Sequence, residues 1–166
     1  MRYLRLDGNF IATVLAVVFF VILAPQLAPF APWMPNADLD PSWAWATNEA
    51  VARGLSFGRQ FLLQTGPYSA IYNNFYHPET YGLMLAGGIF LAGAFALNLV
   101  SLRRENNSVS LVAAVALVLF MLAAPGSADA KFYVLTFLIS LTTIRAAISN
   151  QQSAISNQQS AIRYGF

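Results

Sequence analysis

Hydrophobic residues fall into four long runs along this chain, with polar and proline-rich stretches between them. The runs cover residues 10–30, 81–102, 109–124 and 132–148. The second run carries no charged residue, and a helix of its length crosses about 30 Å of hydrocarbon. The other three are weaker, because Pro25 interrupts the first, the third is short and Arg145 cuts into the fourth. The pattern therefore predicts an all-α polytopic membrane protein with about four transmembrane helices.

The composition supports this class of protein. Hydrophobic residues make up 57% of the chain and charged residues only 10%, far from the balance of a soluble domain. Arg2 and Arg5 before the first run are also typical of a secretory signal. No clean small-x-small cleavage site follows, and a cluster of prolines begins at Pro25, so a first transmembrane helix is the preferred interpretation.

The runs divide the chain into four parts. Residues 1–30 hold the first transmembrane helix, 31–80 a loop of short interfacial amphipathic helices, 81–148 three further transmembrane helices, and 149–166 a low-complexity tail that we expect to be disordered. Six of the nine basic residues lie at the N-terminus, between the second and third runs, and at or beyond the end of the fourth: Arg2, Arg5, Arg103, Arg104, Arg145 and Arg163. This bias predicts both termini in the cytoplasm and residues 31–80 on the extracytoplasmic side.

The loop of residues 31–80 contains clear helix signals. Asp40 followed by Pro41 is typical of a helix start, and Gly54 is typical of a helix stop. Glu49 and Arg53 stand at i and i+4 in the favourable order. A second short helix is expected near residue 67. Many aromatic residues in this loop predict that it lies at the membrane surface.

Part of this loop resembles known membrane proteins. The stretch "LDPSWAWATNEAVARGLSFGRQFLLQTGPYSAIYNNFYHPETY" is similar to one near the N-terminus of large, uncharacterised bacterial polytopic membrane proteins. An acid just outside the first span, followed by a short surface helix and a glycine at Gly54, resembles the first outer loop of C-superfamily membrane glycosyltransferases. The resemblance covers residues 1 to about 145. It implies location in the bacterial cytoplasmic (inner) membrane.

The resemblance also implies a chemistry. In these enzymes a sugar leaves a polyprenyl phosphate at the outer membrane face, and an outer-loop carboxylate acts as general base or positions the acceptor. Carried over to this chain, the catalytic acid is Asp40, with Asp38 second. The family pattern has another acid directly after the first, where this chain has Pro41. We therefore assign no cofactor and no metal site, although a divalent metal at Asp40 stays an alternative.

Two further residues are candidates for substrate binding from their chemistry. The guanidinium of Arg59 could bind a lipid phosphate, and His77, the only histidine, could orient an acceptor. The alternatives are a lipid-headgroup contact for Arg59 and helix termination at His77-Pro78. Asp40 likewise has a structural alternative, capping of the helix that follows it.

The C-terminal tail repeats S-A-I-S-N-Q-Q with a period of seven residues, which corresponds to twenty-one nucleotides. We interpret it as a translated tandem DNA repeat entered after a truncation. The chain is then a fragment or truncated relative of a larger enzyme, and by itself it is expected to be inactive.

Other functions stay open at this point. One alternative is a non-enzymatic membrane scaffold or assembly module, for which Gly88, Ala92 and Ala96 form a small-residue stripe that lets a partner helix approach. Another is a non-functional truncated reading frame. A transporter is disfavoured, because charge is missing from the middle of the spans. A net charge of +2, with no cysteine and no phosphate-binding glycine loop, argues against nucleic-acid binding.

Overall fold

The computed structural model describes residues 8–62, 66–104, 108–123 and 129–164, and its regular structure there is helical. The elements are α1 (Gly8–Leu27), α2 (Leu39–Ala52), the 3-10 helix η1 (Gly66–Tyr68), α3 (Ser69–Asn73), α4 (Tyr81–Arg104), α5 (Ser108–Ala123) and α6 (Ala130–Tyr164). Within these residues the strand-like pairings are two isolated bridges, Trp33 with Phe75 and Phe57 with Phe61. The all-α prediction is confirmed.

Three helices are long and apolar enough to cross a membrane: α1 over Phe10–Leu27, α4 over Tyr81–Leu102 and α6 over Ala130–Ser160. Helix α5 is apolar but has only 16 residues. Its length of about 24 Å falls short of the roughly 30 Å of a hydrocarbon core. Helix α1 continues past Pro25 and ends at Leu27. The proline lies in the last turn, where its missing N–H removes only one backbone hydrogen bond.

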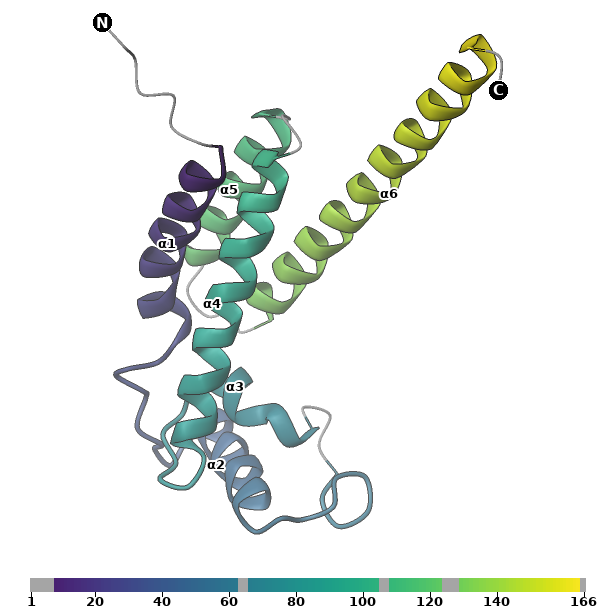
Figure 1. Ribbon diagram of the computed structural model, residues 1–166. Helices are drawn as coiled ribbons and strands as arrows, with labels where there is room; N and C mark the ends of the chain where they lie inside the picture. Colours follow the sequence, from purple (N-terminus) through teal and green to yellow (C-terminus); the bar gives the residue numbers. More distant parts are fainter. Residues whose placement is uncertain (1–7, 63–65, 105–107, 124–128, 165–166) are drawn as a thin grey trace, which may run out of the picture.

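Helix α4 is the centre of the bundle. It runs antiparallel to α1 and contacts α3, α5 and α6 as well (Figure 1). Phe95 and Leu99 of α4 are fully buried, and the core continues through leucines, valines and methionines of α1, α5 and α6. The predicted small-residue stripe of Gly88, Ala92 and Ala96 is buried. At Gly88 it packs against the end of α1, so the helix that approaches it there belongs to the same chain. The outer faces of the long helices expose large apolar side chains, as lipid-facing helices do.

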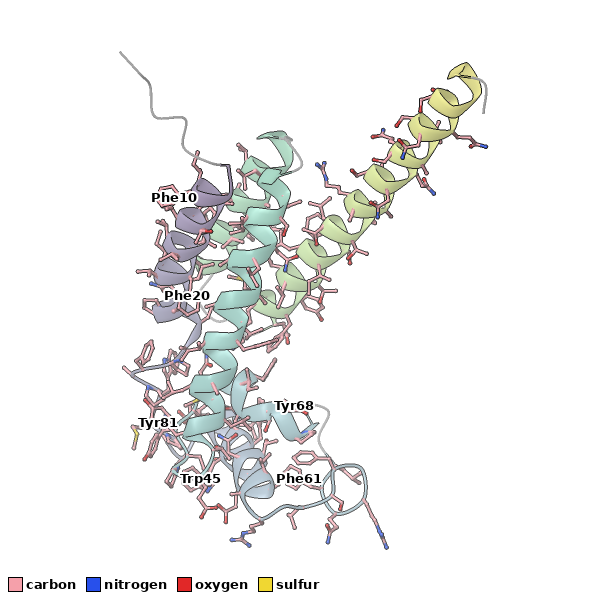
Figure 2. All side chains as sticks on the ribbon, in the orientation of Figure 1. Phe10, Phe20, Trp45, Phe61, Tyr68 and Tyr81 are labelled. Carbon is pink, nitrogen blue, oxygen red and sulfur yellow. The ribbon has the colours of Figure 1, made fainter. Side chains whose placement is uncertain are left out.

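Helices α2 and α3 gather at one end of the bundle, around the first turns of α4 (Figure 1). We call the described part of residues 28–80 the loop module. Aromatic side chains crowd this end, among them Trp45, Tyr68 and Tyr81, whereas Phe61 lies on a loop that extends to one side (Figure 2). The loop module is therefore a folded unit attached to the start of α4.

The tail differs from the disordered segment that we predicted. Helix α6 continues without a break to Tyr164, through both copies of the repeat. Alanine and glutamine favour helices, and no glycine or proline occurs between residues 130 and 164 to end one. Residues 146–160 are all exposed, so this part of α6 extends from the bundle without packing against it (Figure 1).

Candidate functional site

Helix α2 begins two residues earlier than the sequence indicates. Its N-cap is Asp38, whose carbonyl accepts hydrogen bonds from the amide (3.1 Å) and the hydroxyl (2.7 Å) of Ser42. Capping by Asp40 is therefore a wrong prediction. Pro41 fits the first turn because amides there have no partner within the helix. The Asp38 carboxylate makes no capping bond and instead accepts from the Asn36 amide at 2.6 Å.

The C-terminal end of α2 follows the prediction. Gly54 has φ +65°, the left-handed conformation that glycine adopts at little cost. Its amide donates to the carbonyl of Val51 (3.0 Å), and the amide of Leu55 donates to that of Ala50 (2.9 Å). This pair of bonds is the Schellman arrangement, which satisfies the last carbonyls of a helix. Gly54 therefore fixes the direction in which the chain leaves α2.

A buried amide network joins α2 to α3. The Asn48 side chain is fully buried and donates to the carbonyl of Phe75 at 3.2 Å. Its own oxygen accepts from the Asn73 amide nitrogen at 3.2 Å, and Asn73 accepts from the backbone amide of Phe75 at 3.0 Å. Because a buried amide without partners is costly, this network specifies how the two helices pack.

Glu49 links α2 to the segment before α4. One carboxylate oxygen accepts from Nε of Arg53 at 2.6 Å, as the i, i+4 spacing predicts, and the other lies 2.9 Å from Nε2 of His77. These hydrogen bonds, first that of His77 and then that of Arg53, lower the pKa of Glu49. His77 is 2% exposed, its ring lies 4.6 Å from that of Trp45, and its buried Nδ1 has no hydrogen-bond partner among the described residues.

Lys131, the only lysine, ties α6 to the loop module. It is buried at the start of α6, and its ammonium donates to the carbonyls of Ile71 (2.8 Å) and Tyr72 (3.3 Å) and to the Asn74 side chain (3.4 Å). The two carbonyls belong to the last turn of α3, where the carbonyl oxygens of a helix have no backbone donors of their own and a cation is favoured. The lysine therefore caps α3 from a different helix.

Tyr72 makes a second connection between α3 and α6. Its ring stacks on that of Phe132, with centroids 6.1 Å apart and an interplanar angle of 19°. Burial raises the pKa of the Tyr72 phenol, and the Asp129 carboxylate raises it further. Together with Lys131, this contact fixes the position of α3 against the bundle.

A pocket of about 500 Å³ opens where the chain enters α2. Asn36 and Asp38 line it together with Trp33 and Phe75, and Met34, Leu39 and Pro41 complete the wall. Trp33 is 72% exposed, and its ring meets Phe75 edge-on at 6.1 Å. We call this the tryptophan pocket. It combines aromatic faces with a carboxylate and an amide, which is the composition of a site for a small polar ligand.

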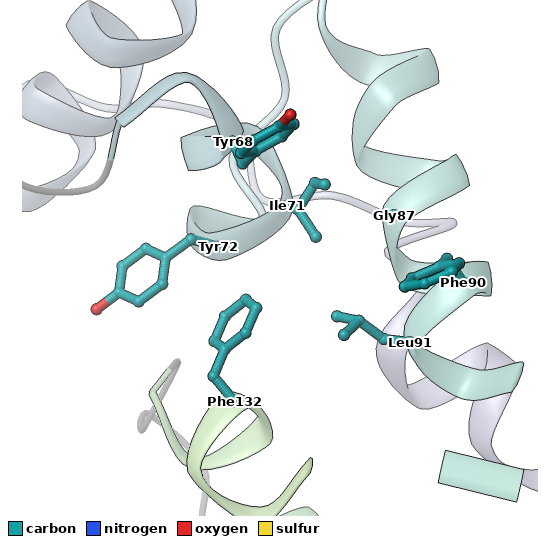
Figure 3. A pocket seen from close by; sticks show the side chains of 7 residues that line it. All are labelled: Tyr68, Ile71, Tyr72, Gly87, Phe90, Leu91 and Phe132. Atoms are coloured by element: carbon teal, nitrogen blue, oxygen red, sulfur yellow. The ribbon is translucent and has the colours of Figure 1, made fainter. Parts of the chain in front are cut away.

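A second pocket, of about 540 Å³, lies between α3, α4 and α6 and is mostly apolar. Figure 3 shows Ile71 of α3 on the side of Phe90 and Leu91 of α4, Phe132 of α6 below, and the Tyr72 ring on the opposite side from α4. We call it the apolar pocket. Its α4 residues belong to the membrane-spanning stretch, so hydrocarbon is the environment that fits it.

The four predicted site residues do not form one cluster. Asp38 lines the tryptophan pocket. Asp40 lies in the first turn of α2, two residues further on, but its side chain is outside the described residues. His77 is buried behind Glu49 and Trp45, which favours a structural role. Arg59 is exposed on the side loop between Phe57 and Phe61, which pair with each other at 5.5 Å.

Sequence reasoning gave no role in a site to Trp33, Asn36, Asn48 or Lys131. Only Lys131 carried a usable signal, as a lone lysine at the edge of an apolar run. The other three depend on contacts between segments far apart in the chain. Among the described side chains, no three histidine, aspartate or glutamate residues are grouped so that they could hold a metal ion.

Comparisons of the chain with protein-family models, with curated proteins and with solved structures give no match. The resemblance to C-superfamily glycosyltransferases therefore stays a hypothesis, and a function has to be argued from the pockets and the loop module.

Proposed function

We propose that this chain is an integral protein of the bacterial cytoplasmic membrane whose loop module binds a polyprenyl-phosphate sugar, as a relative of C-superfamily glycosyltransferases. The observation that carries the proposal is the tryptophan pocket, in which the Asp38 carboxylate lies beside an exposed aromatic ring. Asp38 takes the leading role that the resemblance gave to Asp40, because its side chain is the one placed in a pocket.

The state of the Asp38 carboxylate suits it to bind hydroxyl groups. One oxygen accepts from Asn36 at 2.6 Å, and no other side chain in the described part of the chain occupies the second. A carboxylate oriented in this way accepts a strong hydrogen bond from an acceptor hydroxyl and can polarise it for attack on an anomeric carbon. Asp38 is thus the general base or the acceptor-positioning group in this proposal.

The apolar pocket supports the lipid half of the proposed ligand. Tyr72, which lines it, precedes Phe75 of the tryptophan pocket by three residues, so α3 and the residues after it contribute to both. An isoprenoid chain in the apolar pocket would replace contact with bilayer hydrocarbon by contact with aromatic side chains.

The orientation of the chain follows from its charges. In this proposal the N-terminus and the connection between α4 and α5 face the cytoplasm, as the arginine-rich ends favour. The loop module then faces the extracytoplasmic side, where polyprenyl-phosphate sugars are used by the enzymes that the sequence resembles.

Native mass spectrometry of the full chain, released from lipid nanodiscs loaded with undecaprenyl-phosphate hexose, tests the proposal. We expect the wild type to retain one lipid-linked sugar and Asp38→Asn to retain at least fivefold less, because a charge-assisted hydrogen bond contributes about 1.5–3 kcal/mol. Glu79→Gln is the matched control, since it removes an exposed acid elsewhere in the loop module. Equal retention by wild type and Asp38→Asn would remove the proposed role of Asp38, and no retention by the wild type would remove the function.

One observation favours a second function, that of a non-enzymatic assembly module. Residues 146–160 of α6 form a fully exposed helical surface, and Ile148 and Ile155 repeat on it at seven-residue spacing. A partner helix could pack there. Deletion of residues 149–166 would abolish co-purification of a partner if this function holds, and would leave retention of the lipid-linked sugar unchanged if the first one does.

A further inference from the structure

We infer that the tryptophan pocket takes the pyranose ring of a neutral hexose, with a C–H face of the sugar on Trp33 and its hydroxyl groups at Asp38 and Asn36. This inference rests on the proposed function and adds to it the residue that recognises the sugar and the face of the sugar that is recognised.

Trp33 is held in place although most of its ring is uncovered. Its amide donates to the carbonyl of Asn74 at 3.2 Å, and its carbonyl accepts from the amide of Tyr76 at 2.8 Å. The ring of Phe75 meets it at an interplanar angle of 80°. A large ring fixed in this way and still 72% exposed can receive a ligand with little further loss of conformational freedom. Its π face is electron-rich, so it attracts the positively polarised C–H groups of a sugar ring.

Asp38 and Asn36 supply the polar half of the site. The carboxylate has an oxygen with no partner among the described residues, and Asn36 keeps its amide oxygen and its second N–H for a ligand. The pair therefore presents acceptors and a donor side by side. Neighbouring hydroxyl groups of a pyranose, each a donor and an acceptor, match this arrangement.

The lining excludes other classes of ligand. The described residues around the pocket include one carboxylate and no basic side chain, so a phosphate group would be repelled inside it, and the phosphate of a lipid-linked sugar would have to lie outside the pocket. A purely apolar ligand would remove water from the Asp38 carboxylate without replacing its hydrogen bonds, which is costly. A neutral ring with both C–H faces and hydroxyl groups satisfies both halves of the site, and about 500 Å³ lies within the usual size of small-ligand pockets.

The competing use of this surface is contact with lipid. Trp33, Met34 and Leu39 all expose large apolar side chains, and such residues also anchor proteins at the membrane interface. The two uses differ in what touches the Trp33 ring, which makes them separable by experiment.

Saturation-transfer difference NMR of the full chain in nanodiscs, with the methyl glycosides of mannose, glucose and N-acetylglucosamine as probes, tests the inference. For at least one glycoside we expect the strongest saturation on C–H protons of one ring face. Trp33→Leu should weaken binding fivefold to tenfold, about the contribution of one aromatic contact. Trp33→Phe should retain most of the affinity because it keeps an aromatic face, and Met34→Leu is the control for a pocket residue without a ring or a polar group.

Three results would overturn the inference. One is equal glycoside affinity in the wild type and in Trp33→Leu. Another is quenching of Trp33 by brominated lipid chains in a Trp43→Phe, Trp45→Phe protein, since the ring would then face lipid. The third is equal retention of undecaprenyl-phosphate hexose by the wild type and Trp33→Leu. In that case the role of Trp33 fails, but the proposed binding of a lipid-linked sugar does not. If the wild type binds neither glycoside nor lipid-linked sugar, the proposed function fails too.

Discussion

The contact between α1 and α4 at Gly88 makes a sharp test of the fold. A Cβ atom at this position would lie 2.5 Å from the carbonyl oxygen of Leu27 and 2.5 Å from Cα of Ala28, both backbone atoms. Ordinary contacts begin at 3.4 Å, so Gly88→Ala requires α1 to move by about 1 Å. Gly93, five residues further along α4, has nothing within 4 Å of its Cβ position and is the matched control.

The magnitude follows from two opposing terms. Alanine favours a helix over glycine by about 0.5–1 kcal/mol, and this gain is common to both variants. At Gly88 it is opposed by overpacking, which costs about 1–3 kcal/mol when the neighbour is rigid. A gap of 0.5–1 Å along the rest of the α1–α4 contact also forfeits a quarter to a half of each dispersion contact, as a general rule. We expect Gly93→Ala to be more stable than the wild type. Gly88→Ala should be less stable than Gly93→Ala by about 1–3 kcal/mol.

Thermal unfolding in detergent micelles measures this difference. For a chain of this size the two variants should differ in Tm by roughly 2–12 °C, with Gly88→Ala lower. Steric trapping of the unfolded state gives the free energy of unfolding directly. If Gly88→Ala is as stable as Gly93→Ala, α1 does not approach α4 at this residue and the packing described above is refuted.

Two further predictions concern the loop module. Lys131→Met removes the donor that caps α3 and should destabilise the contact between α3 and α6 by about 1–3 kcal/mol. Amide hydrogen exchange should therefore increase in residues 66–76 but not in α1. Unchanged exchange in α3 would contradict the capping role. The pKa of Glu49 is lowered in the folded protein, so its stabilising contribution is present above pH 4.5 and is lost as the pH falls through the folded pKa. Thermal stability measured from neutral pH downwards should therefore fall less in Glu49→Gln than in the wild type, and identical profiles would show that the contacts of Glu49 with His77 and Arg53 contribute nothing.

The helices could be predicted from the sequence because their signals are local. Apolar runs marked α1, α4, α5 and the first half of α6, and Gly54 marked the end of α2. The start of α2 was displaced because Asp38 and Asp40 are both suitable caps, and the choice between them depends on how the preceding chain enters the helix. The tail has the low-complexity composition that is typical of disorder, yet up to Tyr164 it contains no helix-breaking residue, and the helix of α6 continues through it.

The site could be predicted only in part, because most of it depends on distant contacts. The Asn48 and Asn73 side chains meet across 25 residues, and Lys131 reaches the carbonyl of Ile71 across 60. No spacing rule relates such positions. Asp38 lines the same pocket as Trp33 and Phe75, and the bridge that brings these two aromatic residues together spans more than forty residues of sequence, roughly the range in which no local pattern applies.

Photo-crosslinking with an undecaprenyl-phosphate hexose that carries a diazirine on the sugar tests directly whether the loop module binds the sugar. The chain is reconstituted in nanodiscs, irradiated and digested, and the labelled peptides are identified by mass spectrometry. We expect the label within residues 33–41 and on Phe75, and we expect Asp38→Asn to reduce it whereas Glu79→Gln does not. A label confined to the lipid-facing surfaces of the long helices, and unaffected by Asp38→Asn, would contradict the claim that the loop module binds the sugar.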